Sequence, residues 1–343
     1  MKEDKRKLSD SMQEWLEVFK FPALKRTSYD RLEVTAVAQI YPLLGNKAIN
    51  RITIEDIQNT INDVMVSGLS YSTARKTYLL LAEYFRYLEQ NGIIEFNPVS
   101  CVEMMKKAHY MDAQGKEYKP SNEAVTVFTA EEIERLRKEA FFIYKNGKQK
   151  HTQPGAYFLM LNTGLRRGEL CGLLNSDIDM NDKILHVRRS VKEFSRRKGM
   201  KKLSGQEICV GLPKTSTSVR DIPLNNTALD MINRLRKERW FGTDSPLVPD
   251  ENGGFTKPIY LFRRFQRLQK SAGFNDIRGL HALRHTFATT LINGVVKPDG
   301  STYSLTVKEV ANLLGHTTSE ITELYYVKRD DTRLRGLTDK FNL

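Results

Sequence analysis

The chain has 343 residues, which is enough for two domains with buried cores. It carries 54 Lys and Arg against 41 Asp and Glu, a net charge of +13, which favours a polyanionic partner, either nucleic acid or an anionic membrane surface. No apolar run approaches the roughly 20 residues of a membrane-spanning helix, and the 3 scattered cysteines exclude a disulfide framework and a zinc ribbon.

Residues 1–107 are predicted to form a small helical domain. Apolar residues recur at helical spacing within 12–19 and again within 29–40. Thr53 is the predicted N-cap of the next helix, because acidic residues follow it in the first turn, where the helix dipole favours them. A fourth helix is expected over residues 72–91. The pattern alone predicts a four-helix bundle with a solvated charged face.

The fourth helix carries Arg75, Lys76 and Arg86 outside its apolar positions. Such side chains are usually solvated, but they can also neutralise the phosphates of a nucleic acid. Residues 108–125 are rich in Lys, Gly, Pro, Ser and Asn and show little apolar periodicity, so we expect a linker there. A flexible linker would let two domains close around a duplex from opposite sides.

The second domain, residues 126–343, is predicted to be mainly helical with one small antiparallel β-sheet. A capping-box pattern opens its first helix at Thr129. Strand-like alternation follows in residues 183–187, and two further strands are expected over 207–212 and 219–224, paired with each other as a hairpin. The sequence thus predicts an α+β fold.

The densest positive stretch of the chain lies within residues 188–202. A run of this kind is usually a solvated loop or hairpin tip, although beside a phosphate site it could also follow a nucleic-acid backbone. Arg188, Arg197 and Lys201 are therefore candidate phosphate contacts.

Three short motifs in the second domain combine groups that suit phosphate chemistry. They are Thr163-Gly164-Leu165-Arg166-Arg167-Gly168-Glu169-Leu170, His281-Ala282-Leu283-Arg284-His285 and Leu313-Leu314-Gly315-His316, with Tyr325 nine residues further on. Residues three and four apart share a helix face, so Arg284 and both neighbouring histidines should point the same way. A guanidinium offers a bidentate fork to phosphate, and an imidazole can donate or carry a proton. Taken alone, such a helix start is equally well a solvated face or a polar cap.

The ordered set of Arg, His-x-x-Arg, Gly-His and Tyr resembles the catalytic signature of the tyrosine recombinases, also called the phage integrase family. The resemblance covers about residues 8–335 and is nearest to integrases of conjugative transposons and temperate phages. It implies a helical, SAM-like core-DNA-binding domain ahead of a mainly α catalytic domain with a small antiparallel sheet. It also implies that the basic side chains noted above meet DNA.

Breaking a DNA phosphodiester by transesterification needs a nucleophile, positive donors to the phosphate oxygens, a proton acceptor and an acid for the leaving oxygen. The resemblance assigns Tyr325 as nucleophile, Arg166 and Arg284 as the clamp on the phosphate, His281 as proton acceptor or second donor, His316 as a further donor and Lys214 as the acid. Glu169 is expected to buttress the site.

Two of these roles have a neighbouring alternative. Tyr326 adjoins Tyr325, and on a helix their side chains would point about 100° apart, so only one can address the phosphate. Arg167 competes with Arg166 for the first clamp position. The family's spacing favours Tyr325 and Arg166, and His285 is expected to pack or to orient other groups.

The chain departs from the family pattern in two places. Residues 295–304 are extra between the His-x-x-Arg and Gly-His motifs, where compact members turn tightly. Tyr326-Val327-Lys328 follows the expected nucleophile in place of the frequent x-His. In addition, no separate amino-terminal arm-DNA-binding domain is visible ahead of Leu8, so we expect that the protein lacks one or that this chain is trimmed.

The resemblance implies a site-specific DNA recombinase of a mobile genetic element, active in integration, excision or transposition. Tyr325 would attack the scissile phosphate, forming a 3′-phosphotyrosine and releasing a 5′ hydroxyl. Because the phosphotyrosine keeps the bond energy, neither a metal nor any other cofactor is expected. The sequence also lacks a His-x-His pair, a His-Glu-x-x-His motif and a Walker loop.

The implied partners are double-stranded DNA attachment sites, a homo-tetramer that passes through a Holliday junction, and accessory DNA-bending or excision factors. No membrane partner is implied, and the expected location is the bacterial cytoplasm at the nucleoid. Two other functions stay open. One is relaxation of supercoiled DNA in the manner of a type IB topoisomerase, and the other is a DNA-binding regulator that keeps the fold without the catalysis.

Overall fold

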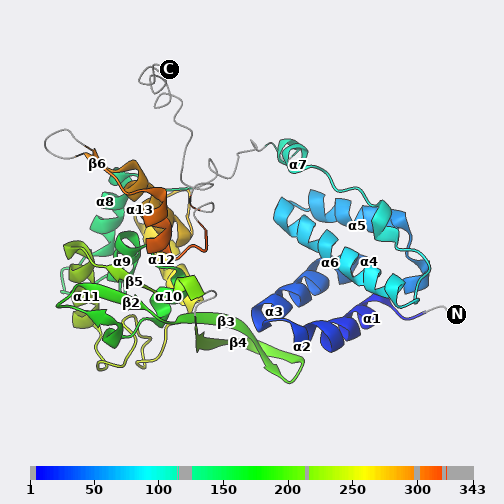
Figure 1. Cartoon of the computed structure of the whole chain (residues 1–343), viewed down its shortest axis with the longest axis horizontal. Coiled ribbons are helices and arrows are strands. Elements are labelled where there is room, and N and C mark those ends of the chain that lie inside the picture. The colour runs from blue at the N-terminus through cyan, green and yellow to red at the C-terminus, as the bar shows by residue number, and fades with distance from the viewer. Residues whose placement is uncertain are drawn as a thin grey trace, which may run out of the picture. The chain divides into compact units, whose positions relative to one another are not determined.

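The computed structural model describes residues 5–113, 115, 126–212, 216–296, 302–318 and 322. The chain divides into two compact units (Figure 1). The helical unit comprises Met1–Tyr118 together with Phe194–Glu207, and the second unit comprises Lys119–Glu193 together with Ile208–Leu343. Within the described ranges, neither unit has a helix whose length and apolar character would let it cross a membrane.

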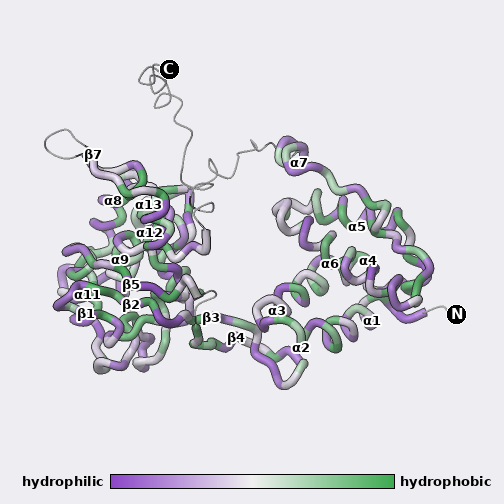
Figure 2. Tube along the Cα trace, in the orientation of Figure 1, coloured by the Kyte–Doolittle hydropathy of each residue, from purple (hydrophilic) through white to green (hydrophobic). Residues whose placement is uncertain are grey.

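Short helical segments build the helical unit. They are α1 (Leu8–Trp15), the π-helical η1 (Leu16–Lys20), α2 (Phe21–Ala23), α3 (Arg26–Thr35), the π-helical η2 (Ala36–Ile40), α4 (Tyr41–Leu44), η3 (Ile49–Arg51), α5 (Ile54–Val66), α6 (Tyr71–Gln90), η4 (Pro98–Cys101) and α7 (Lys107–Ala113). Trp15 and Tyr84 meet edge to face in the core, with ring centroids 5.3 Å apart. Apolar and polar residues alternate along these helices, as expected where one face of each is buried (Figure 2).

The predicted N-cap at Thr53 is confirmed. Its hydroxyl accepts a hydrogen bond from the Asp56 backbone N–H at 3.2 Å, and the Asp56 carboxylate accepts one from the Thr53 N–H at 2.8 Å. This reciprocal pair satisfies two backbone donors that a helix start leaves open. The predicted fourth helix is α6, and the Ser70 hydroxyl caps it by accepting a hydrogen bond from the Thr73 N–H.

The beginning of the predicted linker is wrong, because α7 occupies it. Tyr110 of α7 is buried, its ring centroid lies 5.6 Å from that of Tyr71, and its hydroxyl donates to the Leu69 carbonyl. Met111 of α7 packs against the same core, so this segment is held by partners far away in the sequence, although it has little periodicity of its own.

The second unit is mainly helical. Its helices are α8 (Ala130–Ala140), α9 (Gly155–Thr163), α10 (Arg167–Gly172), η5 (Asn175–Asp177), η6 (Ser216–Ser218), α11 (Asn226–Glu238), α12 (Pro258–Ser271), α13 (His281–Asn293) and α14 (Val307–Leu314). The predicted capping box at Thr129 opens α8 as expected. Helix α9 is apolar on nearly every side and buried, and it packs on α11 and α13.

The strands are β1 (Ile178–Asp179), β2 (Ile184–Val187), β3 (Ser190–Lys198), β4 (Lys201–Gly211), β5 (Arg220–Pro223), β6 (Val295–Val296) and β7 (Thr302–Tyr303). They form three small sheets in the order β1-β2-β5, β3-β4 and β6-β7. The predicted strand 183–187 is confirmed as β2. The extra residues after α13 include the β6-β7 pair, which is antiparallel.

The predicted pairing of strands 207–212 and 219–224 is wrong. Strand β5 pairs with β2, where buried Ile222 lies opposite buried Leu185, and β4 pairs with β3. Strand β4 pairs with the strand directly before it, across a two-residue turn at 199–200, whereas β5 pairs with β2, and the β3-β4 hairpin lies between them in the sequence. The basic run thus forms one long hairpin, and the fold as a whole is mostly helical with small antiparallel sheets, as predicted.

Candidate active site

A glycine turn allows three helices to meet. Gly164 ends α9 in the left-handed conformation, with φ +64°. A Cβ atom at this position would lie 2.6 Å from the Phe287 ring and 2.8 Å from the Leu314 side chain. Only glycine permits this conformation together with this approach, so the Thr163-Gly164 step brings the end of α9 against α13 and α14.

Arg284 of α13 lies at this meeting point and is buried. Its Nη1 donates to the Gly164 carbonyl at 2.6 Å, and its Nη2 donates to the Leu314 carbonyl at 2.8 Å. Both carbonyls stand at the C-terminal ends of helices, where the helix dipole is negative. Burial of a guanidinium is tolerated here because two helix ends supply acceptors of the right sign.

Arg166 stands beside this group at the start of α10. Its Nη1 donates to Glu169 Oε1 at 2.7 Å and to Ser218 Oγ at 3.3 Å, and its Nη2 donates to the Gly315 carbonyl at 3.1 Å. About a third of its side chain, 32%, stays exposed. The guanidinium is therefore oriented by the protein and still open to a ligand.

Glu169 and Arg220 form the layer beneath Arg166. Arg220 donates to Glu169 Oε2 at 3.0 Å and to the Leu313 carbonyl at 2.7 Å, and both side chains are almost fully buried. Burial by itself would raise the pKa of Glu169, but the charges of Arg220 and Arg166 lower it, so the carboxylate stays ionised.

Gly315 closes this layer with a second left-handed turn, φ +65°, at the end of α14. A Cβ there would come within 2.8 Å of the Thr217 carbonyl and 3.1 Å of the Arg220 side chain.

The role of Arg220 was not predicted from the sequence. The available signal was that a buried glutamate needs a compensating cation.

His316 completes the group. Its Nε2 lies 3.0 Å from Arg284 Nη2, and its Nδ1 lies 2.8 Å from Thr322 Oγ1. A guanidinium nitrogen can only donate, so Nε2 accepts and the ring proton is assigned to Nδ1. Burial, followed by the charges of Arg284 and Arg166, lowers the pKa of His316 to about 4. The imidazole is therefore neutral at neutral pH.

His281 and His285 stand one turn apart on α13, with ring centroids 5.9 Å apart and planes nearly perpendicular. His281 keeps contact with solvent, and desolvation followed by the charges of Arg284 and Arg166 lowers its pKa. The pKa of His285 falls to about 4 through burial and through its neighbours His281 and Arg284. The site thus holds neutral imidazoles among fixed cations.

Comparison with known families identifies this arrangement. The model of the phage integrase family matches residues 126–333, and that of the N-terminal SAM-like domain of phage integrases matches residues 7–65. The chain belongs to the phage integrase family. It is accordingly a site-specific DNA recombinase, as the sequence motifs predicted.

The integrase has relatives in several bacteria. It is 28% identical over 303 residues to a XerC-like tyrosine recombinase of Caldanaerobacter subterraneus, covering 83% of this chain and 70% of that one. It is 24% identical over 269 residues to the tyrosine recombinase XerC of Thermodesulfovibrio yellowstonii, covering 78% of this chain and 75% of the other.

Two solved integrases share its fold. The Tn1549 transposon integrase in complex with a circular intermediate DNA matches with a TM-score of 0.69 at 21% identity, over 96% of this chain and 99% of that one. A lambda integrase dimer bound to a COC′ core site matches with a TM-score of 0.64 at 17% identity, over 94% of this chain and 96% of the other.

The structure brings three of the six predicted catalytic residues of the integrase together: Arg166, Arg284 and His316. A fourth, His281, stands on the first turn of α13, close enough for both arginines to affect its pKa. The remaining two, Lys214 and Tyr325, lie outside the described residues.

The predicted DNA contacts divide into two kinds. Arg75, Lys76 and Arg86 are exposed on α6, and Arg188 and Lys201 are exposed at or near the β3-β4 hairpin, so their roles stay predictions. Arg197 is a correction. Its side chain is only 1% exposed and is bonded to Asp30 and Glu33, so it has no surface to offer to a phosphate.

Proposed function

We propose that this integrase exchanges strands between two duplex attachment sites, with Tyr325 as the nucleophile that forms a 3′-phosphotyrosine. The observation that carries the proposal is the convergence of Arg166, Arg284 and His316 from three separate helix ends. Two guanidinium groups there can stabilise the negative charge that grows on the phosphate oxygens during the attack.

The two arginines would serve the phosphate differently. Arg166 keeps an exposed edge and is held by Glu169 and by the Gly315 carbonyl, so it can meet a non-bridging oxygen without rearrangement. Arg284 is buried behind it and would contribute its charge and its hold on His316.

The histidine next to Arg284 needs a change of proton position to act as proposed. His316 Nε2 accepts from Arg284, so it cannot donate to a phosphate in the same state. An anionic phosphate nearby would raise the pKa of this imidazole and favour a proton on Nε2. His281, exposed on the first turn of α13, is the candidate acceptor for the nucleophile's proton.

Lys214 is proposed as the acid for the leaving 5′ oxygen. It comes four residues before Ser218, whose hydroxyl accepts from Arg166 at 3.3 Å. This closeness in the sequence to a residue that contacts the clamp supports the proposal.

A covalent-adduct experiment tests the nucleophile. Wild-type protein, Tyr325→Phe and Tyr326→Phe are incubated with a library of nicked duplexes, and protein–DNA adducts that survive denaturation are measured. We expect adducts from wild type and Tyr326→Phe and none from Tyr325→Phe. Adducts from Tyr325→Phe but not from Tyr326→Phe would move the role to the neighbour, and no adduct from any of them would leave the DNA-binding regulator.

The topoisomerase alternative is separated by the substrate. Relaxation of any supercoiled plasmid by one subunit would favour it, whereas joining of strands from two defined duplexes favours recombination. The solved lambda integrase tetramer on a Holliday junction, which matches this chain with a TM-score of 0.62, supports the second outcome and a homo-tetramer.

We further propose that duplex DNA lies along basic faces of both units. On α12 of the second unit, a hollow of about 550 Å³ is lined by Tyr260, Arg263, Arg264, Arg267 and Lys270. The last three of these residues also line a second hollow of about 610 Å³, together with Lys150 and His151. Side chains of this type track a phosphate backbone. The enzyme would act in the cytoplasm, with accessory DNA-bending or excision factors setting the direction of the reaction.

A further inference from the structure

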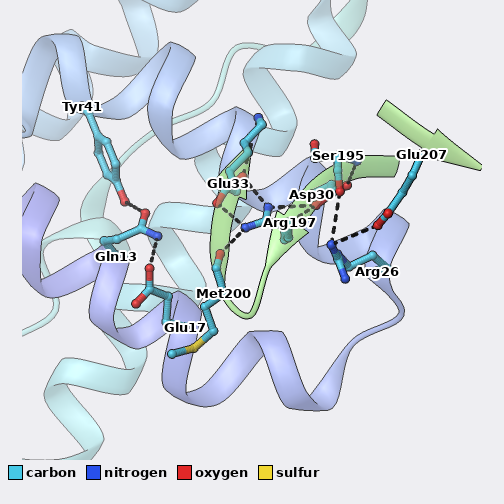
Figure 3. Close-up of polar contacts among 11 residues, drawn as sticks. Gln13, Glu17, Arg26, Asp30, Glu33, Tyr41, Ser195, Arg197, Met200 and Glu207 are labelled. Carbon is cyan, nitrogen blue, oxygen red and sulfur yellow. Dashed lines mark hydrogen bonds and ion pairs between the residues drawn. The ribbon is translucent and has the colours of Figure 1, made fainter. Parts of the chain in front are cut away.

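The β3-β4 hairpin is shared between the two units. Its strands begin and end in the second unit, at Ser190 and Gly211, whereas its tip, Phe194–Glu207, is part of the helical unit. The tip lies against α3 (Figure 3). The chain therefore passes between the units once after α7 and twice more through the hairpin strands.

Arg197 holds the tip to α3 with four of its five donors, and the fifth bonds within the tip. Its Nε and Nη2 donate to Asp30 Oδ1 at 3.2 and 2.9 Å, its Nη1 and Nη2 donate to Glu33 at 3.0 and 2.5 Å, and its Nη1 also donates to the Met200 carbonyl at 2.7 Å. These bonds use all five N–H groups of a guanidinium. The guanidinium also lies 4.8 Å from the Tyr29 ring centroid.

The backbone of the tip is bound to the same helix (Figure 3). The Ser195 N–H donates to Asp30 Oδ2 at 2.6 Å, and the Ser195 carbonyl accepts from Arg26 Nη2 at 3.1 Å. Arg26 also lies 3.7 Å from Glu207 on the opposite strand. Both strands of the tip thus contact α3.

Arg197 is the cation that bonds both acids of α3, whereas Lys202 lies only near Glu33, at 3.7 Å. The side chains of Asp30 and Glu33 are 11% and 7% exposed, and they sit one helical turn apart, where two carboxylates repel each other. Buried carboxylates without a cation are strongly disfavoured. A guanidinium can bond both at once, whereas an ammonium is a single point charge.

We propose that Arg197 with Asp30 and Glu33 is a latch that fastens the hairpin tip, whose strands run from and back to the second unit, to α3 independently of the linker, so that a duplex bound by one unit of the integrase stays within reach of the other. The consequence for DNA binding rests on the function proposed above, whereas the latch itself does not. Two connections in place of one keep the second DNA-binding surface at a high effective concentration once the first is bound.

A cut linker tests the latch without DNA. A specific protease site is inserted within residues 116–125, the full chain is purified and then cut, and the fragments are examined by sedimentation velocity. We expect the cut wild type to sediment as one complex. In Arg197→Ala the two fragments should separate, with a dissociation constant raised on the order of a hundredfold.

Arg196→Ala is the matched control. Arg196 is the neighbouring residue of β3, it points to the other face of the strand and it is exposed, so the variant loses the same charge without touching the latch. Arg197→Lys should bind with intermediate strength. If the uncut Arg197→Ala chain fails to fold, Glu33→Gln, which keeps the arginine and one carboxylate, takes its place with a smaller expected loss.

Three outcomes would overturn the proposal: separation of the wild-type fragments, equally tight association of the Arg197→Ala fragments, or an equal loss in Arg196→Ala. An uncut wild-type dimer that becomes a monomer in Arg197→Ala would show that the hairpin docks on a second copy, and would overturn the assignment of the latch to one chain.

The consequence for DNA is measured separately. Dissociation from an immobilised random-sequence duplex at low salt should be about tenfold faster for Arg197→Ala than for Arg196→Ala. A wild-type protein that does not bind the duplex contradicts the proposed function and leaves the fragment result standing. If the fragments of the cut wild type separate while the uncut wild type still recombines DNA, the latch is contradicted and the proposed function is not.

Discussion

Glu169 holds the positive charges of the active site in place. Its carboxylate is 2% exposed and bonds Arg166 with one oxygen and Arg220 with the other. Arg220 reaches no further than Leu313 and Ser218, so it fixes the end of α14 and does not face the open side of the clamp. One buried acid therefore orients a guanidinium that can meet substrate and another that cannot.

Replacing Glu169 by glutamine should be costly. The variant leaves Arg220, which is 6% exposed, without an anion, and breaking a buried pair in this way costs about 3–5 kcal/mol. Urea unfolding should show this loss, together with reduced adduct formation. Glu134→Gln is the control, because its pair with Arg137 is exposed and should contribute less than about 0.5 kcal/mol. Equal effects of the two variants would contradict the assignment.

Two half-buried histidines, His285 and His316, predict a pH dependence of stability. The pKa values of His285 and His316 are lowered to about 4 in the folded protein, against about 6.5 for an unfolded chain. Between these values the unfolded chain takes up protons that the folded chain does not, so stability falls as the pH falls through this window.

His285→Gln should reduce that dependence. Each imidazole contributes at most about 1.4 kcal/mol per pH unit, so the slope of unfolding free energy between pH 6 and 5 should decrease by up to that amount. Urea titrations of variant and wild type at several pH values measure the difference. Identical slopes would show that His285 is not held neutral in the folded protein.

At the scale of elements, the site is assembled from helix ends. Gly164 is the C-cap of α9, Gly315 is the C-cap of α14, and Arg166 is the N-cap of α10, so backbone carbonyls and fixed charges gather at these helix ends. Two left-handed glycines allow this, because a side chain at either position would enter its neighbours.

Gly164→Ala tests this packing against a matched glycine. Gly199 has a similar φ, +61° against +64°, but a Cβ there meets nothing within 4 Å. In both variants, the strain of an alanine in the left-handed conformation should lower the free energy of unfolding by about 1–2 kcal/mol. In Gly164→Ala, overpacking should lower it by a further 1–3 kcal/mol or so. Denaturation midpoints and adduct yields measure the two. A Gly164→Ala protein no worse than Gly199→Ala would contradict the close approach.

At the scale of the whole molecule, each unit has basic side chains that are exposed to solvent. In the helical unit, Arg75 and Arg86 lie eleven residues apart on α6, about three helical turns, so they share one exposed face. The side chain of Arg197, in contrast, is buried and bonded to Asp30 and Glu33 of the same unit. A basic side chain can contact a phosphate only if it is exposed, and the density of charge along the sequence does not show whether it is.

The salt dependence of binding should reflect this difference. Each lost phosphate contact lowers the slope of log affinity against log salt by about 0.9, so a double Arg75→Ala, Arg86→Ala variant should lose up to about 1.8. Fluorescence anisotropy with a random-sequence duplex between about 50 and 200 mM salt measures it. Lys20→Ala is the control, because Lys20 of η1 already forms an ion pair with Glu83 of α6. A slope unchanged in the double variant would remove α6 from the DNA-binding face.

Sequence alone was sufficient for features that are local. The caps at Thr53 and Thr129 depend on a residue three positions away, and the motifs around Arg166, Arg284 and His316 occur in an order and chemistry that few other families share. Helix positions and the recombinase family follow from such short-range patterns, because spacing along a helix fixes which side chains share a face.

The tertiary structure decided what depends on residues far apart in the chain. The pairing of β5 with β2, the bond of Arg220 to Glu169 and the capture of Arg197 by Asp30 all join segments whose own patterns allow several partners. A basic residue looks the same in a sequence whether it meets a phosphate or a buried carboxylate. Only its packed surroundings, which set the cost of leaving a charge unpaired, distinguish the two.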